Sequence, residues 1–475
     1  MVPSNFPEEI WTQVLGHLDR KQDRKTIHAV RLVNKSLSRI ADPLVYCEIR
    51  SEIHQKTPPE GRDKIGQLQR LAWNVACDPG KARFVKEIRL PRYDFVGQHN
   101  SGIFPSEQKN VDYIEEQYTT VLRDTALSHH LQDEILKFLK DEAPIGHLCF
   151  LLAVCTEIEV LEVRGGTNGI DKLFWKVVLH GAGTIRQNRS HATKGSSYRD
   201  KPVLGALRQI HLGAFNYETS LASIEPFLSL PSIRVFEVFG LGDTETWTEH
   251  SLPTRLFNPE FNTKHNVEML LDSCLLSGEG LDWLLSTCDT VTSLTIRWRP
   301  GLWTNHLIVL KIGDALRRKG KNLRYLHLDT TGARPAQAGK DAESFGSFAN
   351  LTRLKTLAVP ECAFASSTNS DMLTAVMELM PPSLNQVAEV LPPQLKHLAI
   401  LGMDDERRSL FKGIFSFLDF SFVLQNGRLK MPALEKVAYV SWYSYDEDLG
   451  LARIVHKSVD YDNVEGLHKL DTWGK

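Results

Sequence analysis

His147, Cys149 and Cys155 lie close together in the sequence and carry the nitrogen and sulfur atoms that zinc prefers. A structural zinc site usually takes four such ligands in two closely spaced pairs. The chain offers no second pair with that spacing, and none of its seven cysteines belongs to a Cys-x-x-Cys pair. We therefore interpret Cys149 and Cys155 as buried thiols and expect no metal site.

Motifs of enzyme chemistry are also absent from the sequence. It contains no His-Glu-x-x-His helix, no phosphate-binding Gly-Lys-Ser/Thr loop and no Gly-x-Ser-x-Gly elbow. The segment 165–169, Gly-Gly-Thr-Asn-Gly, lacks the spacing of a dinucleotide-binding loop, and we interpret it as a turn. His180 and His191 fall in the Gly-, Ser- and Arg-rich segment 180–202, which predicts a mobile loop with solvated side chains. The sequence thus predicts neither a catalytic site nor a cofactor.

Composition and charge narrow the class of protein. The 475 residues are 42% hydrophobic and 24% charged, with a formal net charge of -2, which is typical of a soluble globular protein. A nucleic-acid-binding protein usually has a basic face and often a high pI, whereas this pI is about 6.8. No run approaches the roughly 18 apolar residues of a membrane span. We expect no nucleic-acid or membrane partner.

Two further features predict the compartment. The first residues, MVPSNFPEEIW, contain neither a basic segment nor an apolar run, so we expect no signal peptide. The cysteines are odd in number and scattered, which fits a reducing environment. These features predict a cytoplasmic or nuclear protein.

The segment 5–49 predicts three short helices. Asn5 can cap the first helix and Glu8, three residues later, completes a capping box, with Pro7 tolerated in the first turn. A second helix carries Ile27 and Val30, and a third begins near Asn34 and is expected to end before Pro43. Helices this short cannot enclose all of their apolar surface. Some of that surface should remain for a partner or for the rest of the chain.

These residues resemble an F-box motif. The resemblance rests on Phe6-Pro7-Glu8-Glu9-Ile10, Val14-Leu15-Gly16-His17-Leu18-Asp19, Arg31-Leu32-Val33-Asn34-Lys35-Ser36-Leu37 and Ile40-Ala41-Asp42-Pro43-Leu44-Val45-Tyr46. In that family the motif binds the Skp adaptor of a cullin-RING ubiquitin ligase. The resemblance therefore implies Skp, cullin and RING subunits as partners. The alternative is an ordinary helical subdomain that packs on the rest of the chain.

The resemblance also implies which side chains contact the adaptor. All of them are apolar and belong to the matched segments, as the centre of a protein interface requires. The candidates are Phe6, Pro7, Ile10, Leu15, Leu18, Leu32, Val33, Leu37, Ile40, Pro43 and Leu44. The sequence does not decide which of these face inward.

Ten short apolar runs recur through the rest of the chain. Each run spans six residues, with apolar residues at its first, fourth and sixth positions and any residue at the other three. They begin at Val85, Ile158, Leu207, Ile233, Asn266, Val291, Leu323, Leu354, Leu395 and Leu434, where Asn266 marks a weaker copy. Alternate residues of a strand point to the same side, so each run predicts a strand with one buried face.

These runs resemble the strand segments of leucine-rich repeats. One such strand cannot bury its apolar face alone, whereas stacked copies can. The expected fold is α/β: a three-helix F-box followed by an irregular leucine-rich-repeat solenoid with a curved parallel sheet and outer helices. The alternative is a generic α/β domain with buried strands.

The expected domain organisation follows from these patterns. It comprises an F-box at 1–50, a helical linker at 51–84, a degenerate repeat domain at 85–445 and a polar C-terminal tail at 446–475. Helical spacing predicts a helix pair inserted near 111–142. Further helices are expected at 303–318, 371–380 and 409–424.

In the repeat geometry, the residues between inward-facing positions line the concave surface. The substrate-binding candidates are Glu162, His211, Glu237, Tyr325, His327 and His397. The sequence as a whole then predicts a substrate-recognition subunit of an SCF-type ubiquitin ligase, with an unidentified protein substrate. Two alternatives remain: an F-box scaffold without a degradative role, and an enzyme whose active site lies in the insertions.

Overall fold

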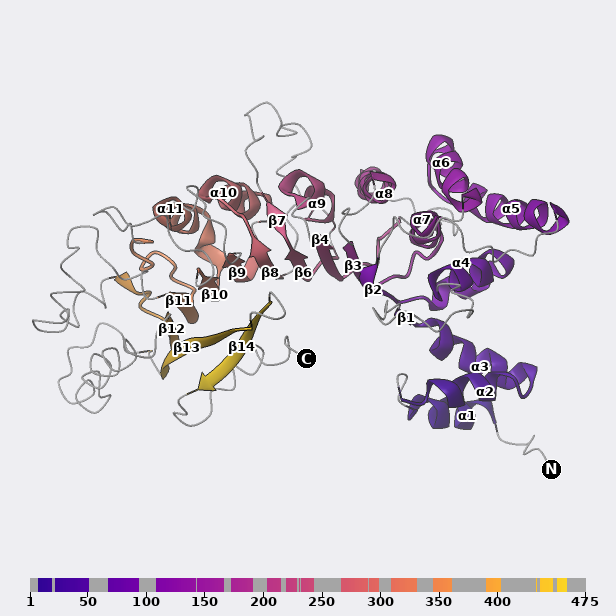
Figure 1. Ribbon diagram of the computed structural model, residues 1–475, viewed down its shortest axis with the longest axis horizontal. Coiled ribbons are helices and arrows are strands. Elements are labelled where there is room, and N and C mark those ends of the chain that lie inside the picture. The colour runs from indigo at the N-terminus through magenta and orange to yellow at the C-terminus, as the bar shows by residue number, and fades with distance from the viewer. Residues whose placement is uncertain are drawn as a thin grey trace, which may run out of the picture. The chain divides into compact units, whose positions relative to one another are not determined.

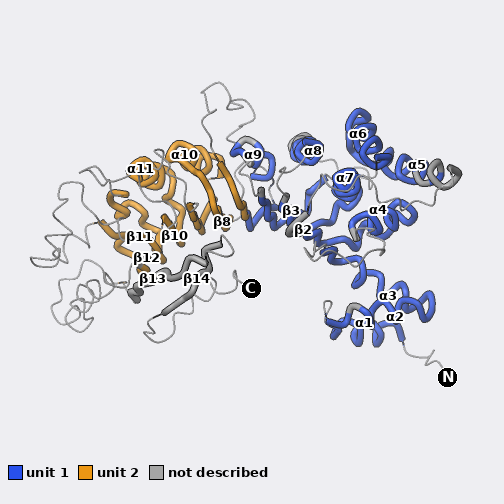
Figure 2. Tube along the Cα trace, viewed as in Figure 1, with its two compact units in different colours: residues 1–236 blue, residues 237–475 orange. Residues whose placement is uncertain are grey.

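The computed structural model describes most of the chain. The described residues are 7–18, 22–50, 67–93, 108–141, 143–165, 172–190, 203–214, 219–228, 230, 232–242, 266–288, 290–298, 309–330, 345–360, 390–402, 433, 436–446 and 451–458. They form a mixed α/β fold with parallel strands and connecting helices (Figure 1). The chain divides into two compact units, residues 1–236 and 237–475 (Figure 2).

The first unit begins with helices and continues with alternating strands and helices. Its elements are α1 (Glu8–Gly16), α2 (Arg24–Arg31), α3 (Lys35–Tyr46), β1 (Glu48–Arg50), α4 (Gln67–Cys77), η1 (Pro79–Phe84), β2 (Glu87–Tyr93), α5 (Gln108–Arg123), α6 (His129–Lys140), α7 (Pro144–Val154), β3 (Val160–Gly165), α8 (Lys172–Ser190), β4 (Gln209–Ala214), β5 (Thr219–Ser220) and α9 (Leu221–Leu228). Strands β1, β2, β3 and β4 are neighbours in that order, and each pair is parallel. The boundary between the units falls within β6 (Val235–Phe239).

The second unit continues the alternation. Its elements are β7 (Leu241–Gly242), β8 (Val267–Cys274), α10 (Gly278–Thr287), β9 (Val291–Trp298), α11 (Val309–Lys319), η3 (Gly320–Asn322), β10 (Tyr325–Asp329), β11 (Thr356–Pro360), β12 (His397–Gly402), β13 (Lys436–Asp446) and β14 (Leu451–Ser458). Strands β8 to β13 pair in sequence order and are parallel. Strand β14 pairs with β13 in the antiparallel sense.

The ten runs predicted from the sequence all fall on strands. They correspond to β2, β3, β4, β6, β8, β9, β10, β11, β12 and β13. The second apolar positions of neighbouring runs are register partners, as Leu294, Leu326, Leu357 and Leu398 show. These four side chains are buried. The α/β class and the parallel sheet are therefore confirmed.

A central helix forms the core of the first unit. Every residue of α7 is buried, which is typical of a helix that is apolar on all sides. Helices α4, α6 and α8 pack against it. The ring of Phe150 lies edge-on to Tyr118 of α5, with the centroids 4.8 Å apart. The helix pair predicted near 111–142 is present as α5 and α6.

The start of the first helix differs from the prediction. Helix α1 begins at Glu8 with Pro7 as its N-cap, and Asn5 lies outside the described residues. Glu8 is thus the first helical residue and not the third, so the predicted capping box is wrong. Its carboxylate accepts hydrogen bonds from Ser36 and Arg39 of α3 instead.

The third helix runs through Pro43, contrary to the prediction that it ends there. Its start is as expected, because the Asn34 side chain accepts a hydrogen bond from the Leu37 amide at 2.8 Å. A proline inside a helix costs about 3 kcal/mol, since one backbone hydrogen bond is lost. Burial of Tyr46 in the last turn, and its hydrogen bond from Arg31, offset part of that cost.

Two other predictions need correction, and several more fall outside the described residues. His180 lies in helix α8 and not in a loop, and its Nε2 atom is 2.9 Å from the Ala126 carbonyl oxygen. The expected polar tail contains strand β14. The helices expected at 371–380 and 409–424, His191 and all of the 165–169 turn except Gly165 lie outside the described residues.

The six described cysteines are free thiols, and five of them are buried. Cys149 and Cys155 are among the buried five, which confirms the interpretation of these two residues. Within the described ranges, no helix has both the length and the apolar character that a membrane crossing requires.

Helix α11 approaches the chain at Phe345 so closely that Gly313 is required. A Cβ atom at Gly313 would collide with the Phe345 carbonyl group, which is backbone and cannot rotate away. We expect Gly313→Ala to destabilise the second unit by about 3 kcal/mol, measured by chemical denaturation. Gly16→Ala is the control, because a Cβ there meets no atom within 4 Å. Equal unfolding free energies for Gly313→Ala and the unchanged protein would contradict this close packing.

Candidate functional site

The N-terminal helices α1, α2 and α3 share a small apolar core. Leu15, Ile27 and Ala41, one from each helix, are buried together. Five partly buried side chains pack against them, namely Leu18, Val30, Ile40, Leu44 and Val45. The three helices therefore form a unit whose interior uses only part of its apolar side chains.

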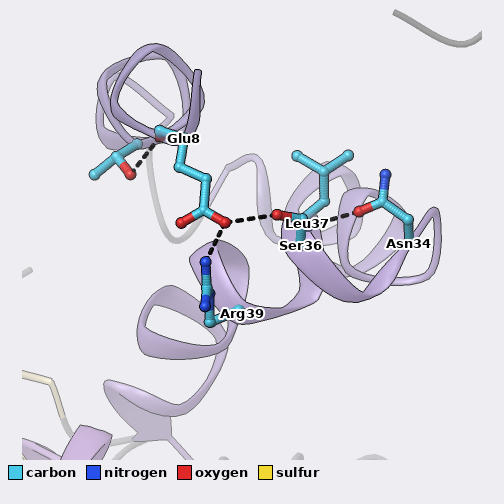
Figure 3. Close-up of polar contacts among 6 residues, drawn as sticks. Glu8, Asn34, Ser36, Leu37 and Arg39 are labelled. Carbon is cyan, nitrogen blue, oxygen red and sulfur yellow. Dashed lines mark hydrogen bonds and ion pairs between the residues drawn. The ribbon is translucent and has the colours of Figure 1, made fainter. Parts of the chain in front are cut away.

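Polar contacts fix the first turn of α1 against the start of α3 (Figure 3). The Ser36 hydroxyl donates to the Glu8 carboxylate at 2.7 Å, and Arg39 forms an ion pair with the same group. The hydrogen bond from Ser36, followed by the one from Arg39, lowers the pKa of Glu8. The Glu8 carboxylate thus stays ionised and keeps the two helices in register.

A second set of contacts joins α2 to α3 and α3 to η1. Arg31 Nε lies 2.6 Å from Asp42 Oδ1, and Arg31 also donates to the Tyr46 hydroxyl at 2.8 Å. The guanidinium carbon lies 5.1 Å from the centroid of the Tyr46 ring, and the Lys81 ammonium nitrogen lies 5.6 Å from it. Since Lys81 belongs to η1, its cation–π contact joins α3 to the rest of the first unit, whereas the Arg31 contact holds α2 against α3.

Large apolar side chains remain exposed on this helical unit. Leu32 is 85% exposed and Val33 54%, both in the connection between α2 and α3. Ile10 and Val14 are also exposed, and their spacing of four residues places them on one face of α1. The exposed large apolar side chains of the helical unit thus lie on α1 and on the connection between α2 and α3.

The predicted adaptor-binding residues include buried, partly buried and exposed side chains. Leu15 and Leu37 are buried, so they hold the helices together and do not face outward. The exposed ones are Pro7, Ile10, Leu32 and Val33, and the partly buried ones are Leu18, Ile40, Pro43 and Leu44. Phe6 lies outside the described residues.

In the first unit, the predicted substrate-binding residues belong to a charged row on the strands. Glu162 of β3 is the register partner of Arg89 on β2 and of His211 on β4. Its carboxylate lies 3.6 Å from Arg89 Nη1 and 3.2 Å from Arg164 Nε. Glu162 is thus held between two guanidinium groups, and His211 beside it is partly buried.

In the second unit, the predicted residues on β10 belong to a more buried cluster. His327 has no exposed surface, and neither of its ring nitrogens has a hydrogen-bond partner in the described structure. Burial lowers the pKa of His327 to about 4, with Asp329 opposing that shift. The imidazole is therefore neutral at pH 7 and does not present its ring to solvent.

An ion pair lies beside this histidine. Arg297 of β9 is the register partner of Asp329, and its Nη1 atom lies 3.5 Å from Asp272 Oδ2 of β8. Burial raises the pKa of Asp272, and Arg297 opposes the shift. Burial also raises the pKa of Tyr325. Glu237 of β6 is buried, whereas His397 of β12 is partly buried, with Nδ1 3.4 Å from the Thr356 hydroxyl.

Asp272, Arg297 and Asp329 are not among the residues predicted from the sequence. Each lies one position beyond the third apolar residue of its run, after Leu271, Ile296 and Leu328. Alternate residues of a strand point to the same side. Asp329 therefore shares the face of Tyr325 and His327. Continuing the period of two to the end of each strand would have found these residues.

The zinc candidates are held by other contacts. His147 is buried in α7, and its Nδ1 atom is 3.2 Å from the Ala143 carbonyl oxygen. Burial lowers the pKa of His147 to about 4 and raises the pKa of the Cys155 thiol. Among the described side chains, no three His, Cys, Asp or Glu residues are grouped as metal ligands would be.

The arrangement as a whole offers surfaces for binding. The N-terminal helices present exposed apolar side chains, and the strands of each unit carry charged side chains that are held by ion pairs. Compared with known proteins, the sequence matches no protein-family model and no curated protein.

Proposed function

We propose that this chain is the substrate-recruiting subunit of an SCF-type ubiquitin ligase. In this proposal α1, α2 and α3 act as an F-box that binds the Skp adaptor, and through it the cullin and RING subunits. The strands that follow act as degenerate leucine-rich repeats that bind a protein substrate.

The exposed apolar side chains of the helical unit carry the proposal. Leu32, Val33, Ile10 and Val14 belong to the segments that resemble the F-box. Large apolar residues exposed on so small a helical unit are candidates for an interaction site, and buried anchors at the centre of an interface supply most of its binding energy. A stable interface of about 1,600 Å² would cover such a group.

The regular pairing of the strands supports the repeat part of the proposal. Equivalent positions of successive runs are register partners from β9 to β13, ending with the pair Leu398 and Val437. From β9 to β12 these register partners are buried in the same way, as in stacked repeats. Helices α10 and α11 lie on one side of β8, β9 and β10 (Figure 1).

The proposed role needs no acid, base or nucleophile from this chain. A receptor subunit holds its substrate next to a ubiquitin-charged enzyme, so that the encounter becomes effectively intramolecular. The chain contributes position, and catalysis belongs to other subunits of the complex.

Co-purification from cell extract tests the proposal. The variant carries Ile10→Ser, Leu32→Ser and Val33→Ser, three exposed positions whose change should leave the helical core intact. The control carries Leu179→Ser and Leu310→Ser, exposed apolar positions outside the helical unit. We expect the unchanged chain and the control to retain adaptor and cullin, and the triple variant to lose at least about 90% of both, measured by quantitative mass spectrometry.

Two results would contradict the proposal. One is the absence of adaptor and cullin from the material bound to the unchanged chain. The other is their equal recovery with the triple variant. Proteins that remain bound to the triple variant are the substrate candidates.

A further inference from the structure

Ser36 lies at the contact between α1 and α3, where a small chemical change would alter both helices. It is exposed in the first turn of α3. Its hydroxyl donates a hydrogen bond to Glu8 Oε1 at 2.7 Å, and Arg39 Nη2 donates to the same oxygen atom (Figure 3). One carboxylate oxygen of α1 thus accepts from both side chains of α3.

The helix geometry places the two donors next to each other. Ser36 and Arg39 are three residues apart, a spacing at which the side chains of a helix are neighbours. In the unmodified chain Arg39 forms its ion pair with Glu8, because the Ser36 hydroxyl is neutral. An anionic group on Ser36 would give Arg39 a second possible partner within its own helix.

Other hydroxyl groups of the helical unit lack this combination of exposure and interhelical bonding. The Thr12 hydroxyl donates to the Glu8 carbonyl oxygen at 2.8 Å, a bond within α1. Ser38 is partly buried. The Ser36 hydroxyl is therefore both accessible to an enzyme and part of the contact between two helices.

The sequence around Ser36 is basic. Arg31, Lys35 and Arg39 fall within five residues of it, and the nearest acidic residue in the sequence, Asp42, is six residues away. Arg31 and Arg39 form ion pairs in the folded chain, and Lys35 is exposed. Protein kinases select their substrates partly by such charge patterns. The segment suits a kinase whose substrate groove is acidic.

We propose that Ser36 is a phosphorylation site and that its phosphate releases α1 from α3. A protein kinase transfers the γ-phosphoryl group of a nucleoside triphosphate to Ser36 Oγ. The Oγ–phosphorus bond forms, the bond from the γ-phosphorus to the bridging oxygen breaks, and the nucleoside diphosphate leaves. The hydroxyl proton passes to the base of the kinase. The product carries about -1.5 to -2 charges at pH 7.

The phosphate reverses the contact with α1. The hydrogen bond that the Ser36 hydroxyl donates is lost, and the new negative charge repels the Glu8 carboxylate. The phosphate also competes for Arg39, because it carries more charge than a carboxylate and belongs to the same helix. Its position in the first turn of α3 is favourable for an anion. Both bonds that hold Glu8 are therefore weakened together.

The expected consequence, loss of adaptor binding, rests on the proposed function. Ile10 and Val14 belong to α1, whereas Leu32 and Val33 lie in the connection that precedes α3. Displacement of α1 moves the first pair relative to the second, so a partner that binds both pairs loses contacts. The loosening of α1 does not depend on the adaptor. A separate measurement of α1 therefore distinguishes failure of this inference from failure of the proposed function.

Hydrogen exchange and adaptor binding of the full-length chain test the proposal. The modified chain carries phosphoserine at position 36, introduced during translation, and phosphatase treatment of the same preparation gives the unmodified reference. A second modified chain also carries Glu8→Gln, which removes the repelled charge and keeps a similar shape. The control is Thr26→Asp, which adds a negative charge at an exposed position in the first turn of α2.

We expect amide exchange in α1 to be about tenfold faster in the modified chain than in the reference, and exchange in α7 to be unchanged. Calorimetric titration should show about tenfold weaker binding of the purified Skp adaptor. Glu8→Gln in the modified chain should bring both values to within about threefold of the reference. Thr26→Asp should behave as the reference does.

Three results would overturn the proposal. The first is equal exchange of α1 in the modified chain and the reference, and the second is failure of Glu8→Gln to slow that exchange. The third is the absence of a Ser36 phosphopeptide from the chain isolated from its own cells with phosphatases inhibited, as measured by mass spectrometry. Faster exchange of α1 together with no adaptor binding by the reference would support the inference and contradict the proposed function.

Discussion

Lowering the pH from about 7 to about 5 is expected to remove roughly 2 kcal/mol of unfolding free energy from the first unit and less from the second, through one buried histidine in each. His147 of α7 is 1% exposed and His327 of β10 is 0% exposed. Burial lowers the pKa of each to about 4, against an ordinary value of 6.5. Folding excludes water from both rings, and the charged form is therefore disfavoured in the native state.

The direction of the effect follows from which state binds the proton. Between pH 6.5 and about 4 the unfolded chain protonates each histidine while the folded chain does not. Stability is therefore full above pH 6.5 and is lost as the pH falls through this window. The raised pKa of Asp272 acts in the opposite sense in the second unit, because its protonation is favoured by folding. The net loss should be smaller there than in the first unit.

Chemical denaturation at about pH 7, 6 and 5 measures this dependence. The loss of unfolding free energy between pH 7 and pH 5 should be about 2 kcal/mol smaller in the first unit of His147→Gln and in the second unit of His327→Gln. His130→Gln, at an exposed position of α6, should retain the full loss. A pH dependence that is identical in all four proteins would contradict the burial of the two rings.

Replacement of Leu15 by alanine is expected to unfold α1, α2 and α3 selectively. Leu15 is 2% exposed and forms the core of these helices with Ile27 and Ala41. Loss of a buried leucine side chain costs about 2 to 5 kcal/mol, and so small a core has little stability to lose. Hydrogen exchange of the backbone amides in these helices should accelerate by about 30-fold or more.

The neighbouring residue provides the matched control. Val14 is 48% exposed on the same helix, so Val14→Ala removes apolar atoms that are already in contact with solvent. Exchange in Val14→Ala should remain close to that of the unchanged chain. Equally fast amide exchange in the two variants would contradict the burial of Leu15 in this core.

The strands could be predicted from the sequence because their signal is local. In the runs of β9, β10 and β11, the apolar residues that recur at every second position, such as Leu326 and Leu328, are those that the structure buries. A period of two needs no knowledge of distant residues. The parallel arrangement followed from the helices between the runs, since parallel strands need such crossovers.

The errors arose where distant contacts decide the local structure. Glu8 has the sequence position of a capping residue, but Ser36 and Arg39 bind its carboxylate. Segment 180–202 contains glycines and polar residues that favour a loop, yet α8 continues through His180, which contacts the Ala126 carbonyl. Neither partner can be identified from a local window of sequence.

The sequence pattern identified which residues belong to the candidate sites, but it did not predict which of their side chains are exposed. Periodicity identifies Leu15 and Leu32 equally well as apolar positions of the helical unit, whereas burial separates them completely. Likewise, alternation placed His327 on the polar face of its strand, but the structure buries its ring. Burial depends on how the elements pack, which the sequence pattern does not contain.

A calorimetric titration of the purified chain with the purified Skp adaptor tests the central claim most directly. The proposed F-box predicts saturable one-to-one binding with a Kd of about 1 μM or tighter. The triple variant at Ile10, Leu32 and Val33 should bind at least about tenfold more weakly, and the Leu179 and Leu310 control should bind as the unchanged chain does. No saturable binding, or equal binding of the triple variant, would contradict the assignment of α1, α2 and α3 as an F-box.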